Sequence, residues 1–252
     1  MALVLKTRHE KRAMQNILEV KNLTVSFNNE KVIDKLSFNL KKGENLVVVG
    51  PNGAGKTVLL RTLIGMIPFE GEIKWQENVN PHTKIGVGVK IGYVPQKILP
   101  EKNIPLSIEE FFNFKKVDSN QIVKALKSVG INDLSVLKKK IGVISSGQLQ
   151  RILIAWSLIG NPEILLFDEP LSGIDIEGEE TIYNLLSQIE RERNLAIILI
   201  THDLSVVYKF ADSVLCMNKK VICYGSPQEA LTPQKLNQLY GGEIKLYKHD
   251  HH

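Results

Sequence analysis

The sequence has 252 residues and no long uninterrupted stretch of apolar side chains. Its longest nearly continuous run covers 152–159 and is interrupted only by Ser157, whereas a helix that crosses a bilayer needs about 18 to 20 apolar residues. The sequence therefore predicts no membrane-spanning segment. Charged side chains begin at Lys6 and no small-residue cleavage site follows, so we also expect no secretory signal. Together these absences favour a cytoplasmic protein.

Cysteine is scarce as well, because the chain has only Cys216 and Cys223. Two cysteines cannot form the disulfide framework of a small secreted domain, and their spacing does not match a C-x-x-C zinc motif. We expect both to be reduced thiols packed inside the fold. The rest of the composition is ordinary for a globular protein, with 43% hydrophobic and 23% charged residues. It allows a sizeable core and argues against disordered, collagen-like and coiled-coil chains.

The net charge of +5 is modest, and its distribution weakens the case for nucleic-acid binding. Four basic side chains lie within the first twelve residues, and Lys138–Lys140 form a smaller cluster. A nucleic-acid-binding domain would instead carry its basic residues over one face. We therefore expect a solvated basic arm over 1–16 and no nucleic-acid partner, with contact to anionic lipid or RNA as the alternative for the arm.

The hydrophobic pattern changes along the chain. Apolar residues over 20–27 fall near a strand pattern, and those over 36–40 alternate strictly with polar residues, which is typical of antiparallel strands with one face in water. By contrast, 46–49, 164–167 and 196–200 are short continuous apolar runs, as expected of strands covered by helices on both faces. Helical spacing follows each run. The sequence thus predicts an α/β fold with a mostly parallel sheet and an N-terminal antiparallel β subdomain.

The segment from about 97 to 160 has helical spacing and few strand signals. Ser107 and Glu110 have the spacing of a helix capping box. Apolar stripes over 122–129 and 149–156 each end close to a glycine. We expect this segment to form an α-helical subdomain inserted into the sheet.

A glycine-rich segment follows the first continuous apolar run and precedes helical spacing over 58–64. It matches the pattern G-x-x-x-x-G-K-[ST] of a phosphate-binding loop, or P-loop. Backbone N–H groups of such a loop surround phosphate oxygens, and the helix N-terminus adds positive potential. Lys56 is expected to bridge the terminal phosphates and Thr57 to bind Mg²⁺. The predicted nucleotide-binding residues are Gly50, Pro51, Asn52, Gly53, Ala54, Gly55, Lys56 and Thr57.

Two adjacent carboxylates, Asp168 and Glu169, follow the second apolar run. They lie at the carboxyl end of a predicted parallel strand, which is where open α/β sheets bind ligands. We expect Asp168 to hold Mg²⁺ through its water shell and Glu169 to polarise the water that attacks the γ-phosphate. An acidic turn without a catalytic role is the alternative, and the P-loop upstream makes it the weaker one.

A third motif, Ser145-Ser146-Gly147-Gln148, lies about twenty residues before Asp168 at the expected start of a helix. With it the chain, over 17 to about 240, resembles the ATP-binding subunits of ABC transporters. Their signature reads LSGGQ, and this chain differs by Ile144 for leucine and Ser146 for the first glycine. In the family the signature of one subunit contacts ATP held by another. The resemblance therefore implies a nucleotide-binding role for Ser145, Gly147 and Gln148, while a serine there also fits a simple helix cap.

The resemblance implies further site residues. Gln96 corresponds to the family's glutamine that reaches the Mg²⁺ and the attacking water, and His202 to the histidine that contacts the γ-phosphate. Asp175 ends a segment that resembles the loop at the dimer seam, and Phe27 corresponds to an aromatic residue that stacks on adenine. The expected catalytic residues are Glu169, His202, Gln96 and Lys56, and the expected metal ligands are Thr57, Gln96 and Asp168.

The resemblance also implies partners. Because the chain has one set of motifs, two copies should form a head-to-tail dimer around ATP, and a separate integral membrane permease should supply the pore. The segment 106–114 is the expected permease-docking face, with core packing as the alternative. It contains Ile108, Phe111, Phe112 and Phe114.

The C-terminal pattern over 214–227 and 231–241 is similar to that of zinc and manganese importers within the family. It implies an ATP-hydrolysing subunit of a metal importer, on the inner face of the membrane, with an extracytoplasmic metal-binding protein in the same system. An importer of chelated iron remains an alternative, as does a soluble ATPase with non-membrane partners, for example in iron–sulfur cluster assembly. The expected domain covers 17–240, followed by a tail over 241–252 whose histidines could bind a divalent ion weakly.

Overall fold

The computed structural model describes residues 15–76, 89–96, 104–170 and 176–241, with the side chains of 176–180 left out of the description. Most of the basic arm, most of the C-terminal tail, the start of the expected helical insert and Asp175 lie outside the described residues. Within them, no helix is long and apolar enough to cross a membrane.

The predicted mostly parallel sheet is confirmed. Its strand order is β5 (Ile91–Val94), β6 (Ile164–Asp168), β7 (Ala196–Ile200), β3 (Asn45–Val49), β8 (Ser213–Asn218) and β9 (Lys220–Gly225). The first five strands are parallel and β9 is antiparallel to β8. The three continuous apolar runs of the sequence are β3, β6 and β7, and every residue of these strands is buried.

The two faces of this sheet are covered by different layers, because successive side chains of a strand point to opposite faces. Val47, Phe167 and Leu199 belong to one hydrophobic cluster, which they share with α4 (Ser146–Leu158), α5 (Ile176–Arg193) and α6 (Leu204–Phe210). Val48 and Leu166 belong to the other, which they share with α1 (Lys56–Leu63) and the antiparallel sheet. The carboxyl ends of the strands therefore lie between two packed layers.

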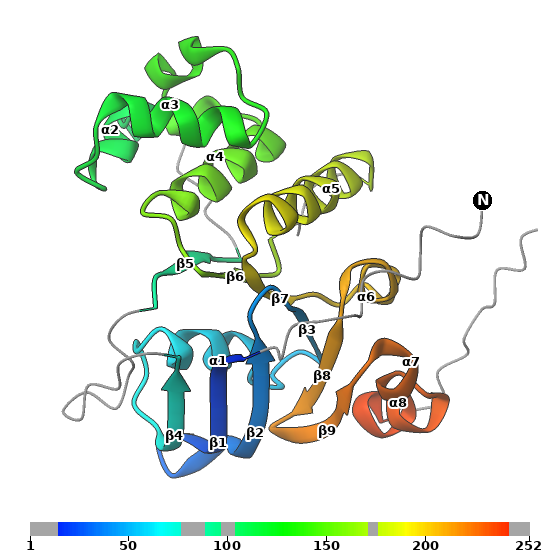
Figure 1. Ribbon diagram of the computed structural model, residues 1–252. Helices are drawn as coiled ribbons and strands as arrows, with labels where there is room; N and C mark the ends of the chain where they lie inside the picture. The colour runs from blue at the N-terminus through cyan, green and yellow to red at the C-terminus, as the bar shows by residue number, and fades with distance from the viewer. Residues whose placement is uncertain (1–14, 77–88, 97–103, 171–175, 242–252) are drawn as a thin grey trace, which may run out of the picture.

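The N-terminal antiparallel sheet has the order β2 (Glu30–Lys41), β1 (Asn16–Phe27) and β4 (Glu70–Trp75). Strands β1 and β2 are those that the alternating pattern predicts. Strand β4 was not predicted, because only Ile73 and Trp75 point into its core and the other side chains are exposed. Figure 1 shows this sheet below α1, at the opposite end of the molecule from the helical subdomain.

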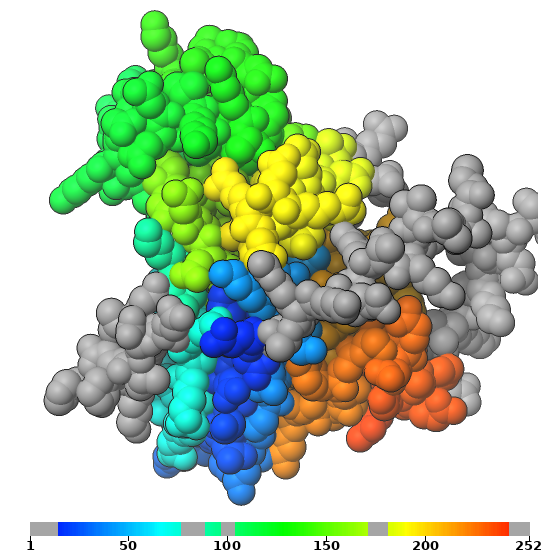
Figure 2. Space-filling model, in the orientation of Figure 1, coloured from blue at the N-terminus to red at the C-terminus, as the bar shows by residue number. Residues whose placement is uncertain are grey.

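The helical subdomain comprises α2 (Ile108–Asn113), α3 (Ser119–Ser128), η1 (Leu134–Lys138), η2 (Ile141–Val143) and α4. It forms a separate lobe in Figures 1 and 2. The predicted capping box is confirmed: Ser107 Oγ accepts from the Glu110 N–H at 3.2 Å, and Glu110 Oε2 accepts from the Ser107 N–H at 2.8 Å.

The expected docking face over 106–114 is in part wrong. Ile108 and Phe112 are fully buried core residues of the subdomain. Phe111 is half-buried and stacks on Trp156 of α4 at 5.5 Å between ring centroids. Only Phe114 is widely exposed, at 69% of its surface. The sequence could not separate the two sets, because buried and exposed aromatic residues are adjacent on one short helix.

Helices α7 (Pro227–Ala230) and α8 (Pro233–Tyr240) pack against β8 and β9. The expectation of reduced cysteines is wrong, since Cys216 and Cys223 form a disulfide across these two strands. They face each other in the antiparallel register, with Cα atoms 4.8 Å apart, and both are buried. Their burial was predicted, but their pairing depends on the register of a hairpin that the sequence pattern did not reveal.

Candidate active site

The P-loop connects β3 to α1 and rests directly on β8. A side chain at Gly50 would overlap the carbonyl oxygen of Met217, and the Lys219 N–H donates to the Ala54 carbonyl at 3.1 Å. Gly55, the N-cap of α1, has φ 94°, and a Cβ there would lie 3.0 Å from the Val32 carbonyl oxygen. Both glycines are therefore required by close approach, and at Gly55 also by a left-handed backbone. The loop is held in shape by its neighbours.

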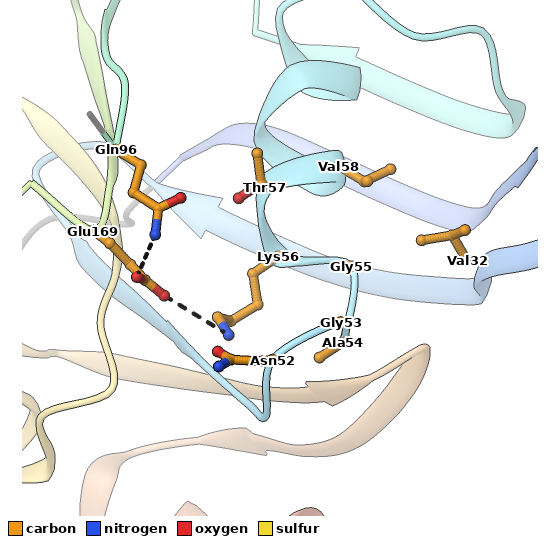
Figure 3. A pocket seen from close by; sticks show the side chains of 10 residues that line it. All are labelled: Val32, Asn52, Gly53, Ala54, Gly55, Lys56, Thr57, Val58, Gln96 and Glu169. Atoms are coloured by element: carbon orange, nitrogen blue, oxygen red, sulfur yellow. Dashed lines mark hydrogen bonds and ion pairs between the residues drawn. The ribbon is translucent and has the colours of Figure 1, made fainter. Parts of the chain in front are cut away.

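A pocket of about 310 Å³ opens beside this loop. Figure 3 shows how its residues lie: on one side of Lys56, Gln96 points toward Glu169 and Glu169 toward Lys56, and Val32 lies beyond Gly55 on the other side. The structure thus brings together the P-loop, the glutamine and the glutamate that the sequence predicted. The lining residues are Val32, Asn52, Gly53, Ala54, Gly55, Lys56, Thr57, Val58, Gln96 and Glu169.

Lys56 begins α1 and is 7% exposed. Its Nζ donates to the carbonyl oxygens of Gly50 at 2.8 Å and Pro51 at 3.0 Å, and lies 3.9 Å from Glu169 Oε1. Burial lowers the pKa of the ammonium, while the charges of Glu169 and Asp168 act in the opposite direction. A buried cation that is held by loop carbonyls and faces an open pocket is suited to bind an anionic group.

Asp168 ends β6 and is 1% exposed. Its Oδ1 accepts a hydrogen bond of 2.9 Å from Thr57 Oγ1. Burial raises the pKa of the Asp168 carboxyl and the charge of Glu169 adds to this, whereas the bond from Thr57 lowers it. Among the described residues, no lysine or arginine lies within ion-pair distance of the Asp168 carboxylate. The site is therefore suited to a cation.

The chemistry of these donors fits Mg²⁺. This ion usually binds through one or two protein oxygens and substrate phosphates, and it keeps several of its waters. Thr57 Oγ1 and Asp168 Oδ1 supply two oxygens beside the P-loop. No group of three or more His, Cys, Asp or Glu side chains lies close enough to hold a metal ion in the part of the chain that the structure describes. The arrangement suits a cation that is shared with a bound phosphate and not enclosed by protein ligands alone.

Glu169 has a left-handed backbone with φ 45°, which is uncommon for a residue other than glycine. In a continuing strand its side chain would point to the opposite face from that of Asp168. The left-handed turn instead lets Glu169 join Lys56 in the pocket, and the Glu169 N–H bonds to the Ile200 carbonyl at 3.2 Å. Gln96 Nε2 donates to Glu169 Oε2 at 2.7 Å. Backbone strain of this kind is characteristic of functional sites.

Several predicted site residues do not line the pocket. His202 is exposed and lies two residues beyond Ile200, which pairs with Asp168 in the sheet. It shares the sheet edge with the site without lining the cavity. Phe27 is 46% exposed at the end of β1, where its neighbour across the hairpin is Glu30. Asp175 lies outside the described residues.

The signature residues are also separate from the pocket. Ser145 is the N-cap of α4 and its Oγ accepts from the Gln148 N–H at 3.3 Å, so the helix-cap interpretation is confirmed. Ser145 and Gln148 are exposed, and a side chain at Gly147 would meet only open space. None of the three lines the described pocket.

The structure adds residues that the sequence reasoning missed. Val32 and Val58 line the pocket, and Tyr93 on β5 directs its hydroxyl at Asp168 Oδ2, 3.4 Å away. Burial, followed by the negative charge of Asp168, raises the pKa of the Tyr93 hydroxyl. Tyr93 lies three residues before Gln96, and recognising strand β5 would have placed it beside β6. With only four residues, the strand is too short to show a clear pattern.

Comparisons with known proteins agree with this geometry. The family model described as ABC transporter matches residues 33–172. The zinc import ATP-binding protein ZnuC of Wigglesworthia glossinidia brevipalpis is 36% identical over 247 residues, covering 94% of this chain and all of that protein. A probable metal transport system ATP-binding protein of Thermotoga maritima is 34% identical over 231 residues, covering 89% of this chain and 90% of its own length.

Solved structures show the same fold. CbiO1 of Clostridium perfringens, part of the ABC transporter complex CbiONQ, superposes with a TM-score of 0.71 at 26% identity, covering 88% of this chain and 93% of that one. An ATP-binding cassette of an ABC transporter in its ADP conformation superposes with a TM-score of 0.77 at 21% identity, covering 91% and 100%. The α/β fold with its helical insert is thus confirmed.

Proposed function

Since this chain belongs to the ABC transporter family and is an ATPase, we propose that it powers the import of a divalent metal ion, zinc or manganese, through a separate membrane permease. The similarity to zinc import ATP-binding proteins over 94% of the chain is the observation that supports this cargo. The ATP-binding domain would cover 17–240, with the basic arm over 1–16 and the tail over 241–252 outside it.

The P-loop would bind the phosphates of ATP. Its N–H groups and the N-terminus of α1 provide positive potential beside the pocket. The Lys56 ammonium, which now donates to the Gly50 and Pro51 carbonyls, would turn to the terminal phosphates. Phe27 would stack on the adenine ring, and its exposure leaves the ring free to do so.

Glu169 would act as the general base. In the structure its carboxylate accepts from Gln96 and lies 3.9 Å from Lys56. Once Lys56 turns to the phosphates, the carboxylate loses its nearest cation and can accept a proton from an attacking water. Gln96 would hold that water and the carboxylate in line, and His202 would reach the γ-phosphate from the same sheet edge.

Thr57 and Asp168 would hold Mg²⁺, with Gln96 as a further ligand. The hydroxyl and carboxylate oxygens of the first two residues are already 2.9 Å apart beside the P-loop. When bound, the ion would neutralise charge on the β- and γ-phosphates. The chain's own contribution is to hold the hydroxyl oxygen of Thr57 and the carboxylate oxygen of Asp168 close together beside the P-loop.

A second copy of the chain would complete the site. The pocket holds the P-loop, Gln96 and Glu169, whereas Ser145 and Gln148 are exposed on the other lobe and Gly147 between them is half-buried. Exposed polar groups at a helix N-terminus are suited to contact a phosphate brought by another molecule. A head-to-tail dimer would thus have two composite ATP sites, with Asp175 at the seam.

The permease and an extracytoplasmic metal-binding protein would be the further partners, with this chain on the cytoplasmic face of the membrane. Exposed Phe114 at the end of α2 supports a docking contact there, because a large aromatic side chain at 69% exposure gains from burial against a partner. The names of the curated relatives favour import over a soluble assembly ATPase.

The experiment that tests this function is purification and reconstitution. The chain, expressed with its neighbouring genes, should co-purify with a polytopic membrane protein. In liposomes the complex should accumulate zinc or manganese only when ATP is present, and Glu169→Gln should abolish this accumulation. Purification with soluble scaffold proteins alone would overturn the importer assignment in favour of an assembly ATPase. Uptake of chelated iron instead of free metal would overturn the cargo but keep the transporter.

A further inference from the structure

Asp168 has a second hydrogen-bond partner besides Thr57. Tyr93 of β5 pairs in register with Leu166 of β6, two residues before Asp168 on the same face of the sheet. From there its hydroxyl lies 3.4 Å from Asp168 Oδ2, while Thr57 occupies Oδ1. The two oxygens of one buried carboxylate are therefore engaged from two different elements, strand β5 and helix α1.

Arg61 adds a third member to this arrangement. It lies one helical turn after Thr57 on α1, so the two side chains leave the helix on the same face. Its positive charge acts on the Tyr93 hydroxyl and on Asp168, where it opposes the rise in pKa that burial causes. Since an ionised carboxylate only accepts, the Tyr93 hydroxyl is the donor of the bond to Asp168.

We propose that Tyr93 is a positioning residue for the magnesium site: its hydroxyl holds the Asp168 carboxylate in the rotation that keeps Oδ1 toward Thr57. This inference rests on the proposed ATP and Mg²⁺ site. A carboxylate rotates about a broad, two-fold torsion unless both oxygens are held. When Thr57 turns its hydroxyl to the metal, Tyr93 is the donor that still fixes Asp168.

Packing alone does not account for the hydroxyl. The ring of Tyr93 packs with the cluster between the sheet and α1, where phenylalanine would fill the same space. A half-buried hydroxyl among apolar neighbours is unfavourable without a partner. Here the partner is the Asp168 carboxylate. Partners of metal ligands commonly change metal affinity by about 10- to 100-fold when removed.

The test is Tyr93→Phe in the full chain. Two affinities are measured: that of a fluorescent ATP analogue in EDTA, and that of Mn²⁺, followed by its paramagnetic resonance signal, for the complex of chain and ATP. We expect Mn²⁺ to bind about tenfold more weakly and the metal-free nucleotide affinity to stay unchanged.

Tyr224→Phe is the matched control. It removes a hydroxyl that donates to the Asn39 carbonyl at 2.7 Å, on β9 and away from the pocket, and should leave Mn²⁺ affinity at the wild-type value. An unchanged Mn²⁺ affinity in Tyr93→Phe would overturn the inference. So would a loss of nucleotide affinity in EDTA as large as the loss of Mn²⁺ affinity, because it would mean that the change disturbs packing of the whole site. Failure of the wild-type chain to bind nucleotide would overturn the proposed function and this inference together.

Discussion

Two regions of the molecule differ in how many of their functional groups have a partner within the same chain. We call them the P-loop side, which holds Lys56, Asp168 and Glu169, and the signature side, which is the start of α4 at 145–148. Lys56, Asp168 and Glu169 are buried or half-buried and each has a hydrogen-bond or ion-pair partner. At the start of α4, Ser145 and Gln148 are exposed and Gly147 faces open space. The polar groups of the P-loop side thus find their partners within one chain. The helix N-terminus on the signature side faces solvent and can take a ligand from another molecule.

Removing the base should give the largest effect, and it tests the P-loop side. Glu169→Gln keeps the shape and the hydrogen bond to Gln96 but cannot take a proton. We expect kcat to fall about 1,000-fold while ATP still binds. The dimer should then accumulate in its ATP-bound form. Glu109→Gln, an exposed carboxylate on α2, is the control. Turnover near the wild-type rate in Glu169→Gln would refute the assignment of the base.

The helical lobe contains its own contrast between core and surface. Phe112→Ala should lower the free energy of unfolding by about 3–5 kcal/mol, because the side chain is fully buried. Phe114→Ala should change it by less than about 0.5 kcal/mol, because the side chain is mostly exposed. Denaturant unfolding measures both values, and pull-down with the permease should be weakened by Phe114→Ala. Equal destabilisation by the two changes would contradict the burial pattern.

Gly147→Asp tests the signature side without disturbing the fold. Position 147 is the second residue of α4, where the helix dipole stabilises a carboxylate and the added side chain meets no neighbour. In a composite site that carboxylate would face the γ-phosphate of the other subunit, so ATPase activity should fall about 100-fold. Asn120→Asp places the same charge at the second residue of α3 and should retain activity. Full activity in Gly147→Asp would mean that the signature does not contact ATP.

Of the three changes that are tested by ATPase kinetics, Phe27→Ala should have the smallest effect. Loss of stacking on a base commonly costs about 1–3 kcal/mol, so KM for ATP should rise about tenfold with little change in kcat. Phe27→Tyr retains a ring and should restore affinity. An unchanged KM in steady-state assays would exclude Phe27 from the adenine site.

Much of the fold and of the P-loop side could be predicted from the sequence, because their signals are local. Continuous apolar runs marked β3, β6 and β7, and the spacing of glycines, Lys56 and Thr57 marked the loop. Strand β4 and the four-residue β5 were missed because they bury few residues. Tyr93 was missed with β5.

Other features depend on register and could not be predicted from patterns. The Cys216–Cys223 pair exists because the hairpin of β8 and β9 places these residues opposite each other. The burial of Phe112 and the exposure of Phe114 follow from how α2 packs on α4, because the two residues are of the same type and cannot be told apart by it. Resemblance supplied the roles of Gln96 and His202. The structure supports a place for Gln96 in the pocket, while His202 lies at the sheet edge.

The dependence of ATPase activity on protein concentration tests the composite site most directly. The wild-type chain alone is diluted at saturating ATP, and the rate per molecule is measured at each concentration. Two half-sites that meet only in a dimer predict that this rate falls as the chain is diluted, together with the dimer fraction measured by light scattering. A rate per molecule that stays constant while the chain becomes monomeric would contradict the account.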